Sequence, residues 1–437
     1  MRDRQDTSTG SSYDERPTVA VVGGGISGLT AAYLLQRTHH VTLFEADDRV
    51  GGHAHTHDVP LASGTVPVDS GFIVLNDRTY PLLRRLFDEL GVRTRPTEMS
   101  MNISCSGCGL SYTGGRKVNG IFAQRRRALD PGFWRLLLQI RSFQSHALAF
   151  LEENPDSERS YGDFLDERGF DSHFVTHYAL PIVSCVWSMG HTEALAYPAA
   201  YLFAFLRHHG FLTLGDAPTW HTVVGGSRSY VQAITRRLDV VRPGMRVTAV
   251  SRKPESIELD ARPLGGGSNQ HHDFDKVVIA THADDALALL TDAGVEEQRV
   301  LGAFGYSTNM AWLHRDDSAL PANHHARASW NYRLEDCDTS TDRTRVSYWM
   351  NRLQGHPESE PLIVTLNPEV GPAPHDVVAT MTYRHPTYTA ESVAAQSRLA
   401  SLNSDRLAFA GAYHGWGFHE DGCRSGVAAA EALGVSW

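Results

Sequence analysis

The chain has 437 residues, of which 41% are hydrophobic and 21% charged, with a formal net charge of −10. This length can bury a large core and predicts two or three domains, while the acidic balance argues against a nucleic-acid-binding surface, which would require a basic stripe. No window offers about 18 uninterrupted apolar residues that could cross a bilayer. The five scattered cysteines are typical of a reducing compartment, so we expect a cytoplasmic protein.

The first structural motif along the chain is a nucleotide-binding turn. An apolar strand, residues 19–22, runs directly into Gly-Gly-Gly-Ile-Ser-Gly at residues 23–28. A strand that opens onto G-x-G-x-x-G is typical of the phosphate end of a dinucleotide-binding βαβ unit. Gly23 would allow the tight turn, Gly25 would let backbone amides approach a pyrophosphate, and Gly28 would let the next helix pack against the strand.

The rest of this predicted βαβ unit follows in order. A helix over residues 29–36 leads to a second strand, residues 41–44, which ends at Glu45. This acid lies about 20 residues past the middle glycine, where a carboxylate is expected to bind the ribose hydroxyls. A second glycine pair then predicts another close approach of the backbone to the cofactor. The candidate contacts in this later segment are Arg49, Gly51, Gly52, His53, Gly71 and Phe72.

A second glycine-rich segment lies near the C-terminus. Residues 406–411 are predicted to form a short buried strand, and residues 415–422 a glycine-rich turn before a small-residue helix over residues 427–433. Two glycine-rich, helix-capped segments at opposite ends of a chain indicate one long ligand bound at two places, which favours FAD over NAD. The candidate contacts here are Gly411, Gly422 and Ser425.

This combination resembles the flavin amine oxidase superfamily, which includes phytoene-desaturase-like and protoporphyrinogen-oxidase-like enzymes. The resemblance implies noncovalently bound FAD, with the N-terminal unit holding ADP and the C-terminal helix facing the flavin ring. Residues 220–230 look like the family's central segment, and residues 274–281 look like its late strand near the adenine half of FAD. The resemblance adds four cofactor contacts: Ile26, Ser27, Val247 and Ala280.

Over its whole length the chain is most similar to a bacterial subgroup of FAD-dependent oxidoreductases often encoded beside cyclopropane-fatty-acyl-synthase-like methyltransferases. The segments that carry this similarity are residues 347–351, 365–368 and 417–422. The genes found beside members of this subgroup indicate lipid chemistry.

The predicted fold class is α/β, with a Rossmann-like FAD-binding domain interleaved with an α+β substrate domain. Residues 1–15 are polar and charged, and we expect a disordered tail and not a signal peptide. The FAD-binding domain is expected to take residues 16–76, 215–292 and 404–437. The substrate domain is expected to take residues 77–214, with helices at 80–91, 132–152 and 160–178, and residues 293–403, mostly strands.

Three polar residues near the predicted C-terminal helix are the catalytic candidates: His419, Glu420 and Asp421. We expect them in the turn before the helix, where backbone amides and the helix dipole could stabilise negative charge on reduced flavin. A structural role is an equal alternative, because Asp421 stands where an N-cap residue would be.

Two features differ from the family pattern. Many relatives carry an acid directly after the glycine of the late strand, where it binds the ribityl chain, whereas here Ala412 follows Gly411. Many amine-oxidising relatives also place in the substrate domain a lysine that holds a water against the flavin. This chain has no lysine after Lys276.

Metal and covalent sites are not expected. Cys105 and Cys108 have the C-x-x-C spacing of a zinc or redox site, but no second ligand pair and no thioredoxin-like helix accompany them, so we expect a simple strand turn. Adjacent histidines point apart on a strand or helix, and no carboxylate lies at a fixed helical spacing from them. We therefore expect no metal site at the histidine pairs. Cys423 lies beside the predicted flavin ring, but the cysteine that binds flavin covalently in some family members lies further upstream. We therefore expect no covalent bond between Cys423 and the flavin.

These observations predict an FAD-dependent oxidoreductase that abstracts hydride from a C–H bond of an apolar substrate. The candidate substrate is a fatty acyl chain that is desaturated or isomerised. The alternatives are a flavin amine oxidase, an NAD(P)-dependent dehydrogenase and a non-catalytic flavin-binding subunit. A small molecule or a lipid is the expected partner, and residues 194–206 could touch a membrane, although a buried helix is the plainer interpretation. Six aromatic residues could wall an apolar cavity: Trp187, Trp220, Trp330, Tyr332, Trp349 and Trp416.

Overall fold

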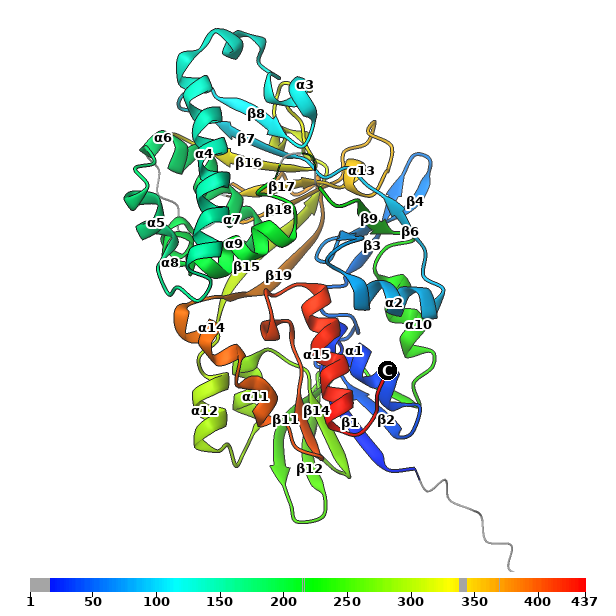
Figure 1. Ribbon diagram of the computed structural model, residues 1–437. Coiled ribbons are helices and arrows are strands. Elements are labelled where there is room, and N and C mark those ends of the chain that lie inside the picture. Colours follow the sequence, from blue (N-terminus) through cyan, green and yellow to red (C-terminus); the bar gives the residue numbers. More distant parts are fainter. Residues whose placement is uncertain (1–15, 214, 216, 338–343, 369) are drawn as a thin grey trace, which may run out of the picture.

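The structure is a computed structural model that describes residues 16–213, 215, 217–337, 344–368 and 370–437, with the side chain of residue 117 excepted. The predicted tail, residues 1–15, lies outside the described residues. The chain forms two lobes, with the two ends of the chain and a parallel sheet in one lobe and a larger sheet faced by helices in the other (Figure 1). The predicted α/β fold class is confirmed.

The first lobe is built on a five-stranded parallel sheet in the order β10-β2-β1-β14-β20. Its strands are short and almost wholly apolar because helices or a second sheet cover both faces. They come from stretches near the start, the middle and the end of the chain. Their bounds are β1 Thr18–Val22, β2 His40–Phe44, β10 Val240–Arg242, β14 Lys276–Ile279 and β20 Leu407–Phe409.

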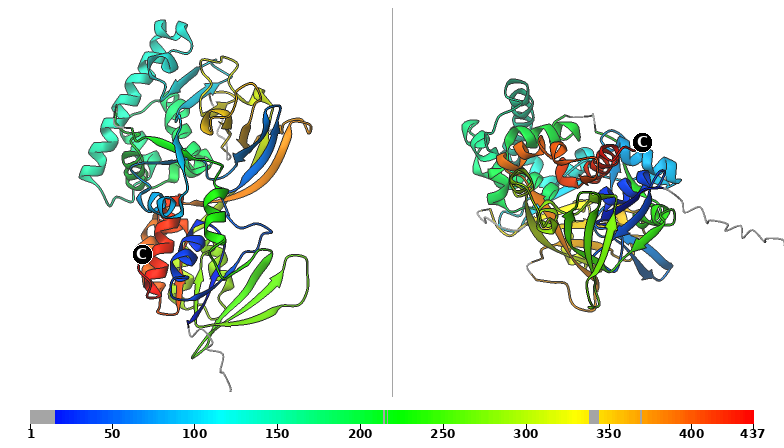
Figure 2. Two further views of the ribbon diagram at one scale, coloured as in Figure 1. Left: turned by 90° about the vertical axis from the view of Figure 1, so that its right-hand side faces the viewer. Right: turned by 90° about the horizontal axis from the view of Figure 1, so that it is seen from below.

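Two helices from opposite ends of the sequence, α1 (Ile26–Leu35) and α15 (His419–Ala432), lie side by side on one face of this sheet (Figures 1 and 2). An antiparallel sheet and two helices cover the other face. These elements are β11 Met245–Arg252, β12 Ile257–Pro263, β13 Gln270–Phe274, α11 Ala283–Leu289 and α12 Val295–Leu301.

The second lobe contains a seven-stranded mixed sheet in the order β19-β15-β18-β17-β16-β7-β8. Helices cover one face of it and share a large apolar core with the strands. The strands are β7 Met101–Cys105, β8 Ser111–Gly114, β15 Gly305–His314, β16 Trp330–Leu334, β17 Val346–Trp349, β18 Ile363–Leu366 and β19 Val377–Thr387. The helices are α4 Pro131–Glu153, α5 Tyr161–Glu167, α6 Ser172–Phe174, α7 Leu180–Trp187, α8 His191–Ala196 and α9 Ala199–His208.

Smaller elements join the lobes. Asp69, at the end of β4, is buried and accepts hydrogen bonds from Ser227 N (2.9 Å), Thr56 Oγ1 (2.5 Å) and Gln354 Nε2 (2.7 Å), so one carboxylate ties together three distant stretches of chain. The remaining elements are β3 Thr56–Leu61, β4 Gly64–Asp69, β5 Leu75–Asn76, β6 Thr94–Pro96, β9 Trp220–Val223, α2 Pro81–Leu90, α3 Lys117–Ile121, α10 Arg228–Thr235, α13 Met350–Leu353 and α14 Ala390–Gln396.

Two predicted helices have different bounds in the structure. The helix expected over residues 160–178 is interrupted, because Gly169 takes a left-handed backbone (φ +67°) after α5, and a new start follows at Asp171, whose side chain accepts from Phe174 N. The C-terminal helix begins at His419 and not near residue 427. Among the described residues, no helix is both long enough and apolar enough to cross a membrane.

Candidate active site

The N-terminal glycine turn has the geometry of a phosphate-binding loop. Gly23 has φ +106°, and a Cβ on it would lie 2.6 Å from the carbonyl oxygen of Ala280, so the turn requires glycine there. A Cβ on Gly28 would lie 1.9 Å from Gly23 O. A Cβ on Gly25, at the start of α1, would meet no atom within 4 Å. Open space at a helix N-terminus is where a pyrophosphate is bound.

Glu45 lies beside this loop, at the end of β2. Its Oε2 accepts a hydrogen bond from Gly24 N (2.8 Å) and its Oε1 accepts one from Asp47 N (2.9 Å). Burial raises the pKa of the carboxyl group above its ordinary value, and the backbone hydrogen bonds oppose the rise. Each oxygen keeps a further lone pair with which it could accept a ribose hydroxyl.

The segment after Glu45 passes directly over the phosphate loop. A Cβ on Gly52 would lie 3.2 Å from Gly25 Cα, and Arg49 holds the turn by donating to Gly52 O (2.8 Å). His53 stacks on Tyr383 with 5.0 Å between ring centroids, and its Nε2 is buried without a hydrogen-bond partner. An orphaned buried donor or acceptor of this kind is expected where a cofactor or substrate completes the site.

The C-terminal glycine-rich segment packs against the start of α1, next to the N-terminal glycine turn. Gly411 N donates to Ser425 Oγ (2.9 Å), and Ser425 Oγ donates to Gly422 O (2.8 Å), which joins β20 to α15. A Cβ on Gly422 would lie 2.6 Å from Ile26 Cγ2 and 2.9 Å from Ser27 Oγ. These side chains therefore pack at the contact of α1 with α15, and that contact brings the two glycine-rich segments together.

His419 forms a flat wall at the start of α15. Its ring stacks on Phe72 with 3.7 Å between centroids and 11° between planes, and its Nε2 lies 3.3 Å from the hydroxyl of Tyr230. Burial lowers the pKa of His419 to about 3, so its imidazole is neutral at physiological pH. Next to Phe72, a Cβ on Gly71 would lie 2.2 Å from His53 O, so this turn has no space for a side chain.

Glu420 and Asp421 both act as helix caps in this structure. Glu420 accepts hydrogen bonds from Leu82 N and Leu83 N, each at 2.9 Å, at the start of α2, and burial raises the pKa of its carboxyl group to about 7. Asp421 accepts from Phe418 N (3.0 Å) and pairs with Arg424 (2.6 Å). Because α15 begins at residue 419, these acids lie in its first turn and not in a turn before it, and they face backbone amides of helix ends.

Two further predicted cofactor residues, Ala280 and Val247, lie after a strand of the parallel sheet and within the antiparallel sheet. Ala280 follows β14 and its N–H donates to Val22 O (2.7 Å), which places it against the phosphate loop. Val247 is buried in β11 where the register with β12 shifts between residues 247 and 249.

Aromatic side chains gather around the turn before α15. Tyr201 lies 5.4 Å from Tyr388 and 5.8 Å from Trp416 between ring centroids, and Trp187 donates from Nε1 to Trp416 O (3.1 Å). The Tyr388 hydroxyl and Trp416 Nε1 are buried without hydrogen-bond partners. Of the six aromatic residues predicted to wall a cavity, this cluster contains Trp187 and Trp416, whereas Trp349 belongs to a separate small core with Leu320.

Sequence reasoning missed a chain of hydroxyl and imidazole groups beside His53. Ser70 Oγ lies 2.7 Å from the Tyr383 hydroxyl and 2.8 Å from His57 Nε2, and the Tyr383 hydroxyl lies 3.3 Å from His55 Nδ1. Burial lowers the pKa of His55 to about 3, so its imidazole is neutral. Tyr383 is on β19, more than 300 residues from Ser70 in sequence, and no local pattern could have paired them.

Comparison with known proteins identifies the family. The model of the family "flavin containing amine oxidoreductase" matches residues 26–369 of this chain. The chain belongs to this family. The membership decides against the nicotinamide-dependent alternative, and it makes the chain an FAD-dependent oxidoreductase.

Curated relatives match over short segments. A carotenoid phi-ring synthase from Streptomyces griseus is 42% identical over 86 residues, which are 18% of this chain and 17% of that protein. A tryptophan 2-monooxygenase from Allorhizobium ampelinum is 58% identical over 45 residues, or 10% of this chain and 6% of that protein. The chain thus spans less than a fifth of either relative.

Solved structures match over nearly the whole chain. The cyclohexylamine oxidase from Brevibacterium oxydans has a TM-score of 0.66 at 16% identity and covers 96% of this chain and 98% of its own. A fatty acid isomerase from P. acnes that produces CLA has a TM-score of 0.65 at 15% identity, with 95% and 98% covered. Identities this low establish a shared fold and leave the substrate open.

The residues present fit FAD. The N-terminus of α1 has open space at Gly25, Glu45 accepts from the adjacent Gly24 N, and Gly52 passes close to Gly25. The buried Nε2 of His53 has no hydrogen-bond partner among the described residues. The α1 N-terminus would hold the pyrophosphate and Glu45 the ribose. The Phe72–His419 pair and the start of α15 would then lie beside the flavin ring.

Proposed function

We propose that this enzyme removes hydride from a C–H bond of a long apolar substrate, most specifically a fatty acyl chain held in a lipid. The observation that supports this is the character of the side chains beside the predicted flavin ring. Phe72, Tyr388 and Trp416 are aromatic, and His419 is neutral. Glu420 and Asp421 already accept backbone hydrogen bonds at helix ends. The charged Arg49 and Arg424 are bound to Gly52 O and to Asp421. An apolar chain can be buried in such surroundings without leaving a charge unpaired.

The positions of the lysines support the same conclusion. Lys276 donates from Nζ to Leu433 O (2.6 Å), and Lys253 pairs with Glu258 (3.0 Å) on the β11–β12 sheet. Residue 117 is on α3, at the far end of the second lobe (Figure 1). Neither Lys253 nor Lys276 is therefore placed to hold a water at the flavin as in many amine-oxidising relatives.

Bound FAD supplies the hydride acceptor in this proposal. The chain contributes position and exclusion of water. Tyr201, Tyr388 and Trp416 would contact the substrate, and each buried methylene contributes about 0.8 kcal/mol to binding, which can hold one C–H bond at the reacting position. The neutral His419 and its stacked partner Phe72 would line the flavin site and exclude water from it. The α15 dipole favours negative charge at its N-terminus.

Two of the similar solved structures determine which reactions the test must distinguish. The first is an amine oxidase and the other a fatty acid isomerase, so the experiment must separate amine oxidation from lipid oxidation and from redox-neutral isomerisation. The oxidised enzyme is mixed anaerobically with mono-, di- and polyamines and, separately, with unsaturated or methyl-branched acyl lipids in micelles. Flavin bleaching is followed, and the recovered lipid is analysed for new or shifted double bonds.

We expect the lipids to bleach the flavin or to be rearranged, and the amines to do neither. Trp416→Phe and Tyr388→Phe should slow the lipid reaction, whereas Trp330→Phe, which alters a ring packed on Tyr348 instead, should not. Rapid bleaching by an amine with inert lipids would reject the proposal in favour of an amine oxidase. Inert lipids and amines together would reject it as well.

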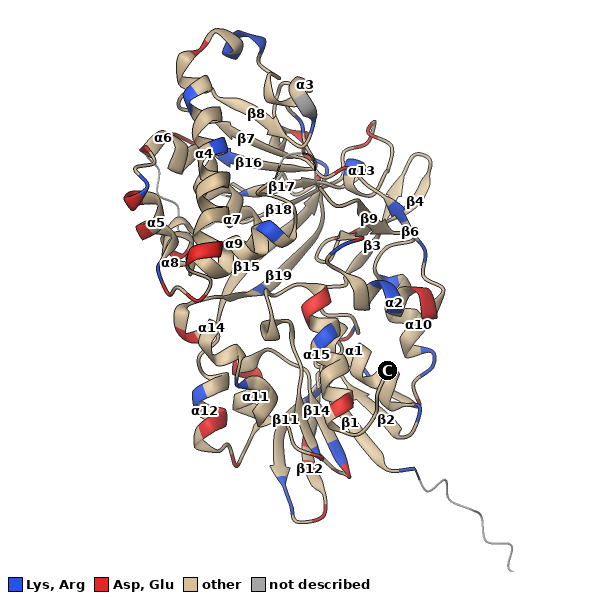
Figure 3. Ribbon diagram, in the orientation of Figure 1, with Lys and Arg blue, Asp and Glu red and all other residues tan. Residues whose placement is uncertain are grey.

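We also propose that the second lobe contacts an anionic lipid surface through the start of α4. The segment considered from sequence, residues 194–206, is buried in α8 and α9 and is not available for this role. At the start of α4, Leu129 is 89% exposed, Leu138 69% and Trp134 47%. Four arginines of the same stretch are also exposed, as expected of a surface that binds acidic headgroups: Arg125, Arg126, Arg135, which pairs with Asp171 (2.8 Å), and Arg141. Figure 3 shows blue segments of the ribbon at and before α4.

Vesicle sedimentation tests this surface. We expect binding to vesicles that contain phosphatidylglycerol and several-fold less binding to neutral vesicles. Leu138→Glu should reduce binding, while Val295→Glu, at an equally exposed position on α12 in the other lobe, should not. Equal binding by both variants, or none by the wild type, would contradict the proposal.

A further inference from the structure

The second lobe contains a cluster of four potential metal ligands that the flavin site does not use. The thiol sulfurs of Cys105, Cys108 and Cys337 and a ring nitrogen of His177 all lie within 4.8 Å of one another. In the sequence, no second pair of metal ligands accompanies Cys105 and Cys108. The folded chain supplies that pair from positions 69 and 229 residues beyond Cys108.

The distances within the cluster match a tetrahedral zinc site. A zinc–sulfur bond of about 2.3 Å and a zinc–nitrogen bond of about 2.0 Å place neighbouring sulfurs about 3.8 Å apart and a sulfur and a nitrogen about 3.5 Å apart. Cys105 Sγ lies 3.8 Å from Cys337 Sγ. His177 Nε2 lies 3.5 Å from Cys108 Sγ and 3.7 Å from Cys337 Sγ. At 3.8 Å, Cys105 Sγ and Cys337 Sγ are not joined by a disulfide bond.

His177 is oriented as a ligand. Its Nδ1 lies 2.9 Å from the backbone oxygen of His173 and can donate to it, which leaves Nε2 as a free lone pair directed at the sulfurs. It lies in a π-helical segment, residues 175–179, between α6 and α7. The Tyr112 hydroxyl donates to His177 O (2.8 Å) and fixes the backbone there. A carbonyl partner on the far ring nitrogen is typical of metal-bound histidine.

Strand pairing brings the cysteines together. Cys105 ends β7 and lies opposite Leu334 of the parallel strand β16, and Cys337 follows three residues later. The β7–β8 turn presses against the segment before Cys337, since a Cβ on Gly107 would lie 2.8 Å from Asp336 Cα. Only a glycine fits at that approach, so the turn is shaped to bring Cys108 to the other ligands.

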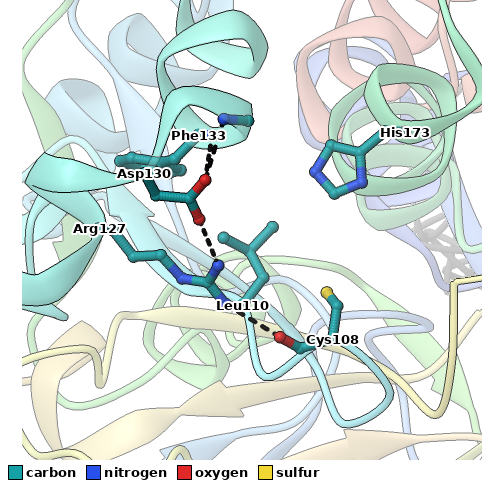
Figure 4. Close-up of a pocket in the computed structure, with 7 residues that line it drawn as sticks. Cys108, Leu110, Arg127, Asp130, Phe133 and His173 are labelled. Carbon is teal, nitrogen blue, oxygen red and sulfur yellow. Dashed lines mark hydrogen bonds and ion pairs between the residues drawn. The ribbon is translucent and has the colours of Figure 1, made fainter.

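The surroundings of the cluster suit its charge. Three thiolates, one neutral imidazole and a divalent ion carry one net negative charge, and Arg127 is close by, donating to Cys108 O (3.0 Å) and pairing with Asp130 (2.6 Å). Figure 4 shows these residues around a cavity of about 220 Å³, with the Cys108 sulfur and the His173 ring on its walls. Solvent and a chelator can therefore reach one side of the cluster.

We propose that Cys105, Cys108, His177 and Cys337 bind one structural zinc ion. Four protein ligands of the Cys3His type leave no open coordination position, so the ion has no catalytic role and instead links the β7–β8 turn and the end of β16 to the helices that cover the sheet. Binding displaces the thiol protons, and no electron transfer is involved. The proposal does not depend on the substrate of the flavin site.

Metal analysis of the purified holoenzyme tests the site directly. Protein from zinc-supplemented medium, purified without chelators, should contain about one zinc per chain, and a chelator should remove it and lower the melting temperature. Cobalt added to the stripped protein should give the visible absorption of a tetrahedral thiolate site. Cys108→Ser and Cys337→Ser should reduce the zinc content at least about tenfold, whereas Cys185→Ser, at a buried cysteine outside the cluster, should retain it.

Three results would overturn the proposal. The first is wild-type protein with less than about a tenth of a zinc per chain that also fails to bind added zinc or cobalt. The second is an unchanged zinc content in Cys337→Ser. The third is a Cys105–Cys337 disulfide found in non-reduced peptides, which would assign the cluster to redox chemistry. Because wild-type metal content decides the matter, variants that fail to fold do not affect the test.

Discussion

Replacing Glu420 by glutamine should change how the stability of the protein depends on pH. The residue is 7% exposed, and its carboxyl group accepts two backbone hydrogen bonds at the start of α2. Burial raises its pKa from an ordinary 4.5 to about 7 in the folded chain. The folded state therefore holds the proton more tightly than the unfolded state, and the wild-type stability falls as the pH rises from about 4.5 to 7.

The size of the effect follows from the same pKa values. Between pH 5 and pH 8 the ionisation of Glu420 costs the folded wild type roughly 2–3 kcal/mol, whereas the amide of Glu420→Gln cannot ionise. For 437 residues unfolding as a unit, an entropy of about 2.1 cal/mol/K per residue gives about 1 °C per kcal/mol. The melting temperature of Glu420→Gln relative to wild type should therefore rise by about 2–3 °C over this range.

The assay is thermal unfolding by tryptophan fluorescence at several pH values, with flavin content measured in parallel. Glu431→Gln, on an exposed position of the same helix, serves as the matched control and should show no such pH-dependent difference. A signed difference in melting temperature, Glu420→Gln minus wild type, that stays constant or decreases from pH 5 to pH 8 would refute the reasoning. A large loss of flavin reduction rate at constant stability would instead assign Glu420 to the chemistry.

Three further predictions concern the cofactor site. Glu45→Ala removes the acceptor of Gly24 N and the expected ribose partner, so FAD should bind at least about tenfold more weakly in equilibrium titration, and unchanged affinity would contradict the assignment. Gly422→Ala places a methyl group 2.6 Å from Ile26 Cγ2 and should separate α15 from α1, which lowers FAD retention on gel filtration. Because burial lowers the pKa of His419 to about 3, His419→Phe should shift no inflection between pH 5 and 8 in the rate of flavin reduction, and a lost inflection would show that the imidazole titrates there.

Much of the nucleotide-binding lobe could be predicted from sequence because its signals are local. The apolar strand, the glycine turn at residues 23–28 and Glu45 lie within one continuous unit, and each requires a particular residue type at a particular spacing. Residues 293–403 are likewise predicted to be mostly strands, and β15 to β19 lie within them.

The catalytic candidates were harder to judge from sequence. Acids at residues 420 and 421 predict either electrostatic help to a cofactor or helix capping, and the same residue types serve both purposes. In the structure, the carboxyl group of Glu420 accepts hydrogen bonds from the backbone amides of Leu82 and Leu83. These residues lie over 330 positions earlier in the chain. Such a partner is invisible until α2 and α15 are packed together.

The sequence by itself therefore determined the α/β class, the strand, glycine turn and helix near the N-terminus, and the presence of a second glycine-rich segment, because the constraints on them act between near neighbours. Only the tertiary structure decided which distant side chains meet. The Ser70–Tyr383 pair and the Cys105–Cys108–His177–Cys337 cluster are set by strand order and helix packing, which join residues far apart in the chain. A binding site requires its side chains to lie within a few ångströms of one another. The number of residues between two side chains does not predict that distance when long loops separate them.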